Sequence, residues 1–247
     1  MLLRHIHLPG LTRYTHASSI QDKLVRQFLA HKASPATLPA PEPTIITAQF
    51  PPVYTCGRRE IGTVTSQQRD YLTEPTPWGQ ADFHEALRGG QTTVHGPGQL
   101  VAYPVVDLKR HRLSARCYVH ALESAVIRTC AQYGVATTRT ENPGVWVAES
   151  KSGSGIEKKI CALGVHLRRN VSSHGIGLNV STELGWFGRI MACGLEGKGT
   201  TSLLDQGVEG LGGEVGVEEV AREFVRAMGE ELKGVEAVVQ IGEGDVD

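Results

Sequence analysis

The chain has 247 residues, of which 40% are hydrophobic, and its 25 lysines and arginines nearly balance its 26 aspartates and glutamates. The formal net charge of -1 argues against a nucleic-acid-binding protein, which is normally basic, and no apolar run reaches the roughly 18 residues of a membrane span. The five cysteines are odd in number and lack CxxC spacing, so we expect a soluble protein of a reducing compartment without disulfides or structural zinc.

Charge is unevenly distributed along the chain. From Asp205 to the end there are 12 acidic residues against 3 basic ones, whereas residues 1–204 hold 14 acidic residues against 22 basic ones. The segment 205–247 can simply be a solvated acidic helix and tail. Alternatively, residues 1–204 present a basic face to an acidic macromolecular partner. We expect 205–247 to be packed on, or to trail, the domain formed by 1–204.

The first predicted element is a helix in an unusually basic segment. Residues 1–32 are acid-poor, as in organellar transit peptides, but apolar residues recur at helical spacing from Ile20 to Leu29. Ser18 or Ser19 is placed to cap such a helix. We therefore assign the segment to the folded domain, so that any cleavable presequence must be very short. The β-branched run from Thr44 to Phe50 then predicts a buried strand.

The remaining elements mix helices with strands. Ser114 can cap a helix that runs to about Tyr133 and stops at Gly134. The apolar spacing of residues 217–232 predicts a second amphipathic helix. Strands are predicted at 144–148, 159–167 and 175–180. Because these elements do not alternate regularly as βαβ units, we predict a mixed α/β (α+β) architecture.

The densest motif is the segment RGGQTTVHGPGQL, residues 88–100. Its glycines let the backbone approach a ligand closely, while Arg88 and His95 supply a fixed charge and a ring that can carry a proton. A lone glycine-rich loop is by default a structural turn, and the order GxxxxGK[ST] of a phosphate-binding loop is missing. Arginine, glutamine, threonine and histidine nevertheless gather in one loop, which favours a binding site.

Two further segments follow as strands. In KKICALGVHL, residues 158–167, a lysine stands at the mouth of an apolar strand. A lysine that points inward can act as a base near neutral pH, whereas one at a strand end usually reaches into water. Lys158 fits the second description better than Lys159. In SHGIGLNV, residues 173–180, two glycines leave room for a ligand, and we interpret His174 as a core histidine.

One cysteine stands apart from the others. Cys193 lies in the glycine-flanked turn ACG, where a thiol can be exposed and can react if a nearby base raises its thiolate fraction. Free cysteines are more often buried small hydrophobic residues. We assign that packing role to Cys56, Cys117, Cys130 and Cys161.

Taken in order, RGGQTTVHGPGQLVAYPVVDL, KKICALGVHL, SHGIGLNV and ACG resemble the lipoyl(octanoyl) transferases of lipoic acid synthesis, from about Leu8 to Leu203. The resemblance implies the fold of the biotin and lipoate protein ligases, a single domain with a mixed sheet flanked by helices and an acyl tunnel, so that 1–204 is the catalytic domain. It also implies transfer of octanoyl from acyl carrier protein to a cysteine. The acceptors are then lysines of the lipoyl domains of 2-oxoacid dehydrogenases and of the glycine-cleavage carrier protein.

The resemblance also implies residue roles. Cys193 matches the acyl-accepting nucleophile, although Ala192 replaces the usual proline before it, and Lys159 matches the lysine that lowers the pKa of the thiol and carries its proton. No metal or cofactor is implied, because octanoyl arrives on the phosphopantetheine of acyl carrier protein. The residues matching the substrate-binding segments are Arg88, Gly89, Gly90, Gln91, Thr92, Thr93, Val94 and His95, then Ala162, Leu163 and Gly164, then Gly175, Ile176 and Gly177.

The sequence is also compatible with two other functions. An ATP-dependent lipoate or biotin ligase of the same fold would work through an acyl-adenylate without a cysteine, and a non-catalytic module would only bind lipoyl domains or acyl carriers. A metal enzyme is a weaker alternative, since the ten histidines form no HxxxH or HExxH pair. We expect a monomer, located in the mitochondrion if the source is eukaryotic and in the cytoplasm otherwise.

Overall fold

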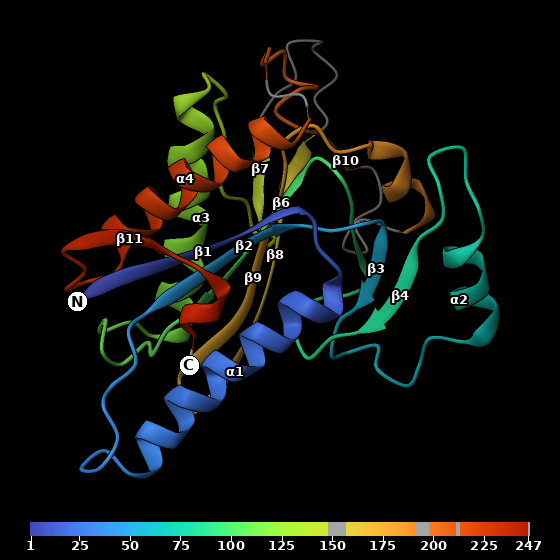
Figure 1. Cartoon of the computed structure of the whole chain (residues 1–247). Helices are drawn as coiled ribbons and strands as arrows, with labels where there is room; N and C mark the ends of the chain where they lie inside the picture. The colour runs from blue at the N-terminus through green and yellow to red at the C-terminus, as the bar shows by residue number, and fades with distance from the viewer. Residues whose placement is uncertain (148–156, 191–197, 211–212, 247) are drawn as a thin grey trace.

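A mixed eight-stranded sheet forms the centre of the computed structural model, which describes residues 1–147, 157–190, 198–210 and 213–246 (Figure 1). Its strands are β1 (Leu2–Leu11), β2 (Thr44–Gln49), β6 (Gln99–Val105), β7 (Val145–Val147), β8 (Lys158–Arg168), β9 (Val171–Asn179), β10 (Gly199–Thr200) and β11 (Ala237–Ile241). They are ordered β10-β8-β9-β6-β2-β1-β11, with β7 also paired to β8. The strands β2, β6, β9 and β8 are antiparallel neighbours, whereas β1 runs parallel to β2 and β11.

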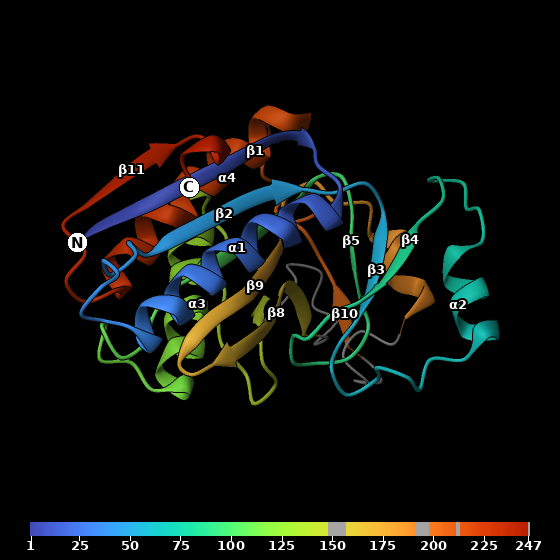
Figure 2. The same cartoon turned by 60° about the horizontal axis from the view of Figure 1, so that its bottom comes forward.

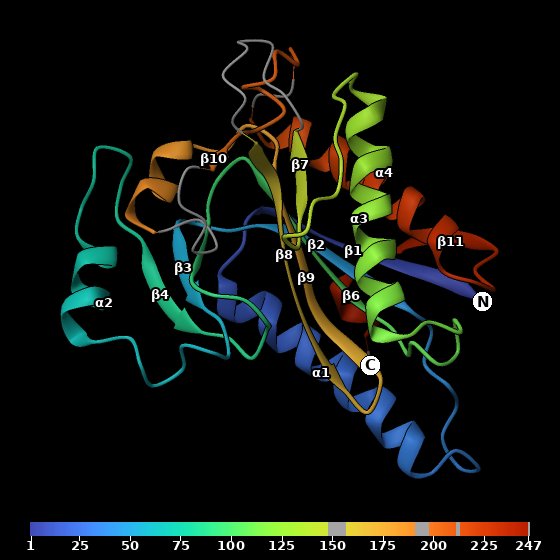
Figure 3. The same cartoon turned by 180° about the vertical axis from the view of Figure 1, so that it is seen from behind.

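Helices cover both faces of this sheet. Helix α1 (Tyr14–Ala33) lies on one face, and α3 (Ala115–Gln132) and α4 (Gly213–Glu231) lie on the other (Figures 1 and 3). On the first face, Leu24 and Phe28 are buried in the same cluster as Tyr103. On the second, the larger cluster includes Leu122 of α3 and Phe224 of α4. The predicted mixed sheet flanked by helices is therefore confirmed.

A smaller lobe stands beside the main sheet and holds the strand that follows the glycine-rich loop (Figure 2). It contains a sheet ordered β4-β3-β5, with β3 (Val53–Cys56), β4 (Asp82–Glu85) and β5 (Thr93–His95), together with α2 (Ser66–Thr73) and the 3-10 helix η1 (Leu184–Arg189). Tyr54 links these parts, because its hydroxyl donates to the carbonyl of Trp186 at 2.7 Å. Strand β5 is held in this lobe by its pairing with β3 and its contacts with η1.

The N-terminal segment differs from the prediction. Residues 2–11 form β1, which lies between β2 and β11, and the sequence did not predict this strand because histidines and an arginine interrupt its apolar residues. Helix α1 begins at Tyr14, with Arg13 in the N-cap position and no side-chain cap. The predicted caps at Ser18 and Ser19 were wrong, since both serines lie inside the helix, where the Ser19 hydroxyl donates to the carbonyl of His16.

The other predicted elements match the structure closely. The Ser114 hydroxyl caps α3 by accepting from the Cys117 amide at 3.1 Å, and Gly134 ends the helix with a φ of 71°. The predicted strands at 44–50, 144–148, 159–167 and 175–180 correspond to β2, β7, β8 and β9, with residue 148 outside the described chain. None of the helices in the described part of the chain is long and apolar enough to cross a bilayer.

The acidic segment 205–247 contributes to the same sheet and core. Helix α4 packs against α3, and β11 extends the sheet beside β1. Several of its carboxylates are paired with arginines: Glu230 lies 2.7 Å from Arg128 and 2.9 Å from Arg226. Part of the acidic charge is thus used in local ion pairs on the α3–α4 side.

Candidate active site

The three predicted substrate-binding segments meet around one cavity, which we call the central cavity. The first segment reaches it from the loop before β5, the second from β8 and the third from β9. Its lining residues are Arg88, Gly90, Gln91, Thr92, Thr93, His95, Tyr103, Ala162, Leu163, Gly164, His174, Gly175, Ile176 and Gly177. Two predicted residues lie just behind this lining: Gly89 donates its amide to the carbonyl of Val165 at 3.0 Å, and Val94 is buried in the core of the smaller sheet.

The second and third segments are direct partners in the β8–β9 hairpin. Ala162 pairs with Gly177, Leu163 with Ile176, and Gly164 with Gly175. Neighbouring backbone lies too close to Gly164 for any side chain, because a methyl group there would lie 2.9 Å from the carbonyl oxygen of Gly89. Because glycine has no side chain, the glycine-rich loop can lie directly against β8.

Arg88 holds that loop in shape. Its guanidinium donates to the carbonyls of Gly89 at 3.0 Å and Gln91 at 2.9 Å, and to both the carbonyl and the hydroxyl of Thr55, at 2.6 and 2.8 Å. The side chain is 7% exposed. Since these contacts tie the loop to β3, the geometry gives Arg88 a structural role in forming the cavity wall.

A second, smaller cavity adjoins the first and contains Lys159, so we call it the Lys159 cavity. It shares Thr92, Thr93 and Ala162 with the central cavity. The remaining lining residues are Lys159, Asn179, Phe187, Ile190 and Thr200. The two cavities therefore adjoin at these three residues, and we call them together the acyl channel.

A β-bulge orients Lys159 toward this cavity. Val145 pairs with Cys161 and Trp146 with Lys159, so β8 carries one extra residue, Ile160, at this point. A bulge shifts the alternation of side chains, which puts Ile160 and Cys161 in the core and leaves Lys159 facing the cavity. The Lys159 ammonium lies 4.6 Å from the centroid of the Trp146 ring, and the residue is 5% exposed. Lys158 is half-buried instead, and its Nζ lies 3.7 Å from Oδ2 of Asp205. Lys159 is therefore the inward lysine, as predicted.

His95 is fixed by a buried network of amides. Its Nδ1 lies 2.6 Å from Oε1 of Gln99, whose Nε2 donates to Oδ1 of Asn179 at 2.9 Å. Asn179 in turn donates to the carbonyl of Thr201. Because the Gln99 oxygen is thereby left as acceptor, Nδ1 of His95 carries the proton and Nε2 keeps its lone pair. Burial, with a smaller contribution from Arg88, lowers the pKa of His95 to about 4, so the ring is neutral at pH 7.

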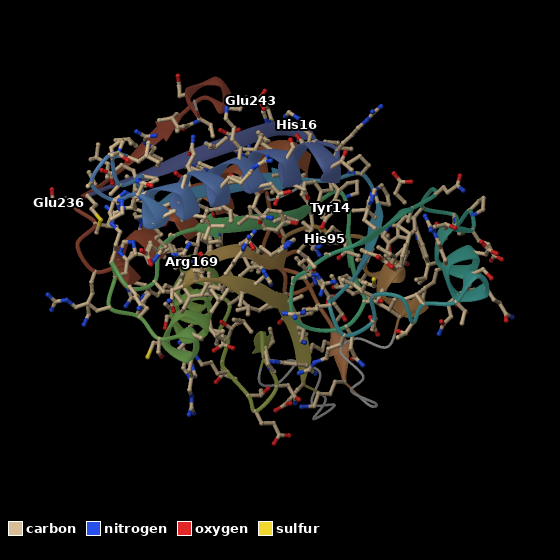
Figure 4. The ribbon with its side chains drawn as sticks, turned by 90° about the horizontal axis from the view of Figure 1, so that it is seen from below. Tyr14, His16, His95, Arg169, Glu236 and Glu243 are labelled. Carbon is tan, nitrogen blue, oxygen red and sulfur yellow. The ribbon has the colours of Figure 1, made fainter. Side chains whose placement is uncertain are left out.

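Two lining residues were not predicted as substrate-binding residues. Tyr103 lies on β6 and His174 on β9, and their rings pack edge to face at 5.4 Å. His174 is buried, as expected for a core histidine, but it also lines the cavity. Its φ of 56°, in the left-handed region, is uncommon outside glycine, yet no sequence pattern reveals it. The ring of Phe50 packs on the rings of Tyr103, His95 and Tyr14, of which Tyr14 lies at the start of α1. Tyr14 and His95 are labelled in Figure 4.

The cysteines separate into three groups. Cys56, Cys130 and Cys161 are buried, and burial raises their pKa values, to about 12 for Cys130, so their packing role is confirmed. Cys117 is exposed in the first turn of α3, so its predicted packing role was wrong. Cys193, the predicted nucleophile, lies outside the described residues, as does Ala192.

The fold and this cavity define the class of the protein. The family described as the lipoyl protein ligase A/B catalytic domain matches residues 13–233. A putative lipoate protein ligase from Thermoplasma acidophilum, solved with bound lipoic acid, superposes with a TM-score of 0.65, covering 100% of this chain and 93% of its own. At 14% sequence identity that likeness concerns the fold alone.

Relatives with similar sequences identify the family within this class. A probable octanoyltransferase of Schizosaccharomyces pombe is 48% identical over 199 residues, which are 80% of this chain and 83% of the relative. A mitochondrial octanoyl-[acyl-carrier-protein]:protein N-octanoyltransferase, LIPT2, of Xenopus tropicalis is 40% identical over 222 residues, 90% of this chain and 84% of the relative. The chain belongs to the octanoyltransferase family, whose members are acyltransferases.

Proposed function

We propose that this protein transfers an octanoyl group from octanoyl-acyl carrier protein to the target lysine of lipoyl domains. The observation that carries the proposal is the convergence of all three acyl-binding segments on one cavity with Lys159 beside it, in a chain whose relatives bear the name octanoyltransferase.

The polar groups of the central cavity suit an apolar occupant. Arg88 donates its guanidinium hydrogens to backbone and threonine oxygens, and His95 is neutral and bonded to Gln99. Ala162 supplies a methyl group and Tyr103 a ring, whereas the side chains of Leu163 and Ile176 pack in the core on the α3–α4 face. An alkyl chain in this space therefore meets polar groups that already have hydrogen-bond partners in the protein, and each methylene that it buries contributes about 0.8 kcal/mol.

The chemistry that we propose proceeds through a thioester on Cys193. The Lys159 amine accepts the thiol proton, and the thiolate attacks the carrier thioester. The phosphopantetheine thiolate then leaves and takes up the proton that Lys159 had accepted. The amine of the target lysine then attacks the enzyme thioester and gives a proton to Lys159, which passes it to the leaving Cys193 thiolate, so that the new bond is an amide and the free thiol is restored. The two-step exchange needs neither ATP nor a metal.

The described residues on either side of Cys193 support this pairing. Ile190 and Thr200 both line the Lys159 cavity, and the Lys198 ammonium lies 5.0 Å from the same Trp146 ring as that of Lys159. Cys193 follows Ile190 by three positions in the sequence, and a stretch of that length spans up to about 10 Å. We therefore expect the thiol to lie within reach of the Lys159 cavity.

We further propose acyl carrier protein as donor, and as acceptors the lipoyl domains of 2-oxoacid dehydrogenases and the glycine-cleavage carrier protein. The enzyme would act as a monomer. In a eukaryotic cell we place this reaction in the mitochondrion, in keeping with the name of the Xenopus relative.

The test is a transfer assay without ATP. Purified protein, octanoyl-acyl carrier protein and a lipoyl domain are mixed, and the intact mass of the lipoyl domain is followed. We expect the mass of one octanoyl group to be added, and none with a lipoyl domain whose target lysine is replaced by alanine. Transfer that requires ATP and free octanoate would instead identify a ligase and contradict the proposal.

A further inference from the structure

His174 separates the central cavity from a second hollow on the α1 side of the hairpin, which we call the outer groove. The outer groove has a volume of about 440 Å³, and its lining includes Tyr14 and Gln21 of α1, His84 of β4 and His166 of β8. Among the described residues, His174 is the one that lines both spaces. His174 therefore lies between the two spaces, and we call it the partition.

The partition is held rigidly. The His174 amide donates to Oε1 of Gln21, itself 2% exposed, at 2.6 Å, and the ring packs edge to face on Tyr103. His174 is 7% exposed, and within the described chain its ring nitrogens make no hydrogen bond. Burial, with a contribution from Arg88, lowers the pKa of the ring to about 3, so the imidazole is neutral at pH 7. A neutral ring can contact the methyl end of an alkyl chain without bringing a charge to it.

The register of the hairpin gives the length of the space in front of the ring. The pair Ala162–Gly177 lies next to the Lys159 cavity, and the pair Val165–His174 is three residues further along. At about 3.3 Å per residue, these pairs are roughly 10 Å apart. An extended eight-carbon chain is about 9 Å long, given carbon–carbon bonds of about 1.5 Å in a zigzag. An octanoyl chain whose carbonyl lies beside Ala162 therefore ends at His174.

We propose that the His174 side chain closes the end of the acyl channel and sets the chain length that the enzyme accepts, with the outer groove as the space that longer chains would enter if the ring were absent. This inference rests on the proposed acyl transfer and adds the residue that determines its substrate range.

The substitution His174→Gly tests it without straining the backbone. Glycine adopts a φ of 56° readily, so this variant should fold while joining the channel to the outer groove. The matched control is Arg169→Gly, because Arg169 also has a left-handed φ, of 51°, but is exposed in the β8–β9 turn, apart from His95 (Figure 4). His174→Asn, whose smaller side chain also tolerates this conformation, provides a second opening of intermediate size.

Two readouts separate this inference from the proposed function. Binding of octanoic, decanoic and dodecanoic acid is measured by calorimetry, and transfer rates are measured with the corresponding acyl carriers. We expect His174→Gly to raise the decanoyl-to-octanoyl ratio about 15-fold in both readouts, which corresponds to the burial of two further methylene groups. The rise should be smaller for His174→Asn and absent for Arg169→Gly. Unchanged chain-length preference in folded His174→Gly and His174→Asn would overturn the role of His174. Failure of the wild-type protein to transfer octanoyl at all would contradict the proposed function instead.

Discussion

Gly164 of β8 lies directly opposite Gly175 of β9, and neither position has room for a methyl group. A methyl carbon on Gly175 would lie 2.3 Å from the carbonyl oxygen of Ala102 and 2.8 Å from Cδ of Pro104. The pair lets the glycine-rich loop approach one face of the hairpin at Gly164 and lets β6 approach at Gly175.

Gly175→Ala should destabilise the protein by about 1–3 kcal/mol, because β9 must move away from β6. Chemical denaturation measures the change in the free energy of unfolding. Gly188→Ala is the control, since Gly188 is exposed and has nothing within 4 Å of the added methyl carbon. Equal stability of the two variants would show that the hairpin tolerates the displacement.

Arg88→Lys should loosen the glycine-rich loop. A lysine ammonium has three donors on one nitrogen and cannot span the carbonyls of Gln91 and Thr55 that the guanidinium joins, so buried acceptors lose their partners at about 1–3 kcal/mol each. We expect lower thermal stability together with slower octanoyl transfer. The exposed substitution Arg59→Lys should change neither, and an Arg88→Lys variant that behaves like Arg59→Lys would refute the structural role.

Lys159→Ala should slow formation of the enzyme thioester at pH 7 by about 10²–10⁴-fold, the usual contribution of a positioned base. Partial recovery is expected at alkaline pH, where the thiol ionises unaided. Single-turnover rates over a pH series provide the measurement. Lys158→Ala is the matched control on the same strand, and similar profiles for the two variants would exclude proton transfer by Lys159.

Three buried histidines should make stability depend on pH. Burial lowers the pKa of His5 and His95 to about 4 and of His174 to about 3, below the value of about 6.5 in an unfolded chain. Their contribution is complete above pH 6.5 and is lost as the pH falls toward 4, since the unfolded state then binds more protons. His5→Gln should reduce the slope of unfolding free energy against pH by about 1.4 kcal/mol per pH unit in that window. An unchanged slope would mean that His5 stays protonated in the folded protein.

The basic character of residues 1–204 leads to a prediction about donor docking. Arg58 and Arg59 are exposed beside the glycine-rich loop, where the Arg58 amide donates to the Arg88 carbonyl at 2.8 Å. If an acidic carrier docks there, reversing both charges to glutamate should raise the KM for octanoyl-acyl carrier protein several-fold at low salt, with kcat unchanged and the effect diminished at high salt. Arg116→Glu, on the exposed first turn of α3, is the control. A KM that does not change would place docking on another face.

The parts of the site that are continuous in sequence could be predicted, because each carries its own pattern. The glycine-rich loop at 88–95 and the two strand segments at 162–164 and 175–177 were recognisable from residue types and order, and the structure brings them to one cavity. The burial of Lys159 also followed from its place beside an apolar run.

What the sequence did not reveal depends on long-range contacts. The bulge at Ile160 exists only because β7 pairs with β8, and the left-handed conformation of His174 is stabilised by Gln21, which is 153 residues away along the chain. Likewise, β1 is a strand because β2 and β11 flank it, despite the histidines in its sequence.

The central claim is that Cys193 carries the octanoyl group with Lys159 as its base, and an intact mass measurement tests it most directly. After incubation with octanoyl-acyl carrier protein and no acceptor, we predict one octanoyl adduct on the wild-type protein, located by peptide mapping to Cys193 and absent from Cys193→Ala. No adduct on the wild-type protein, or an adduct that persists in Cys193→Ala, would contradict the account.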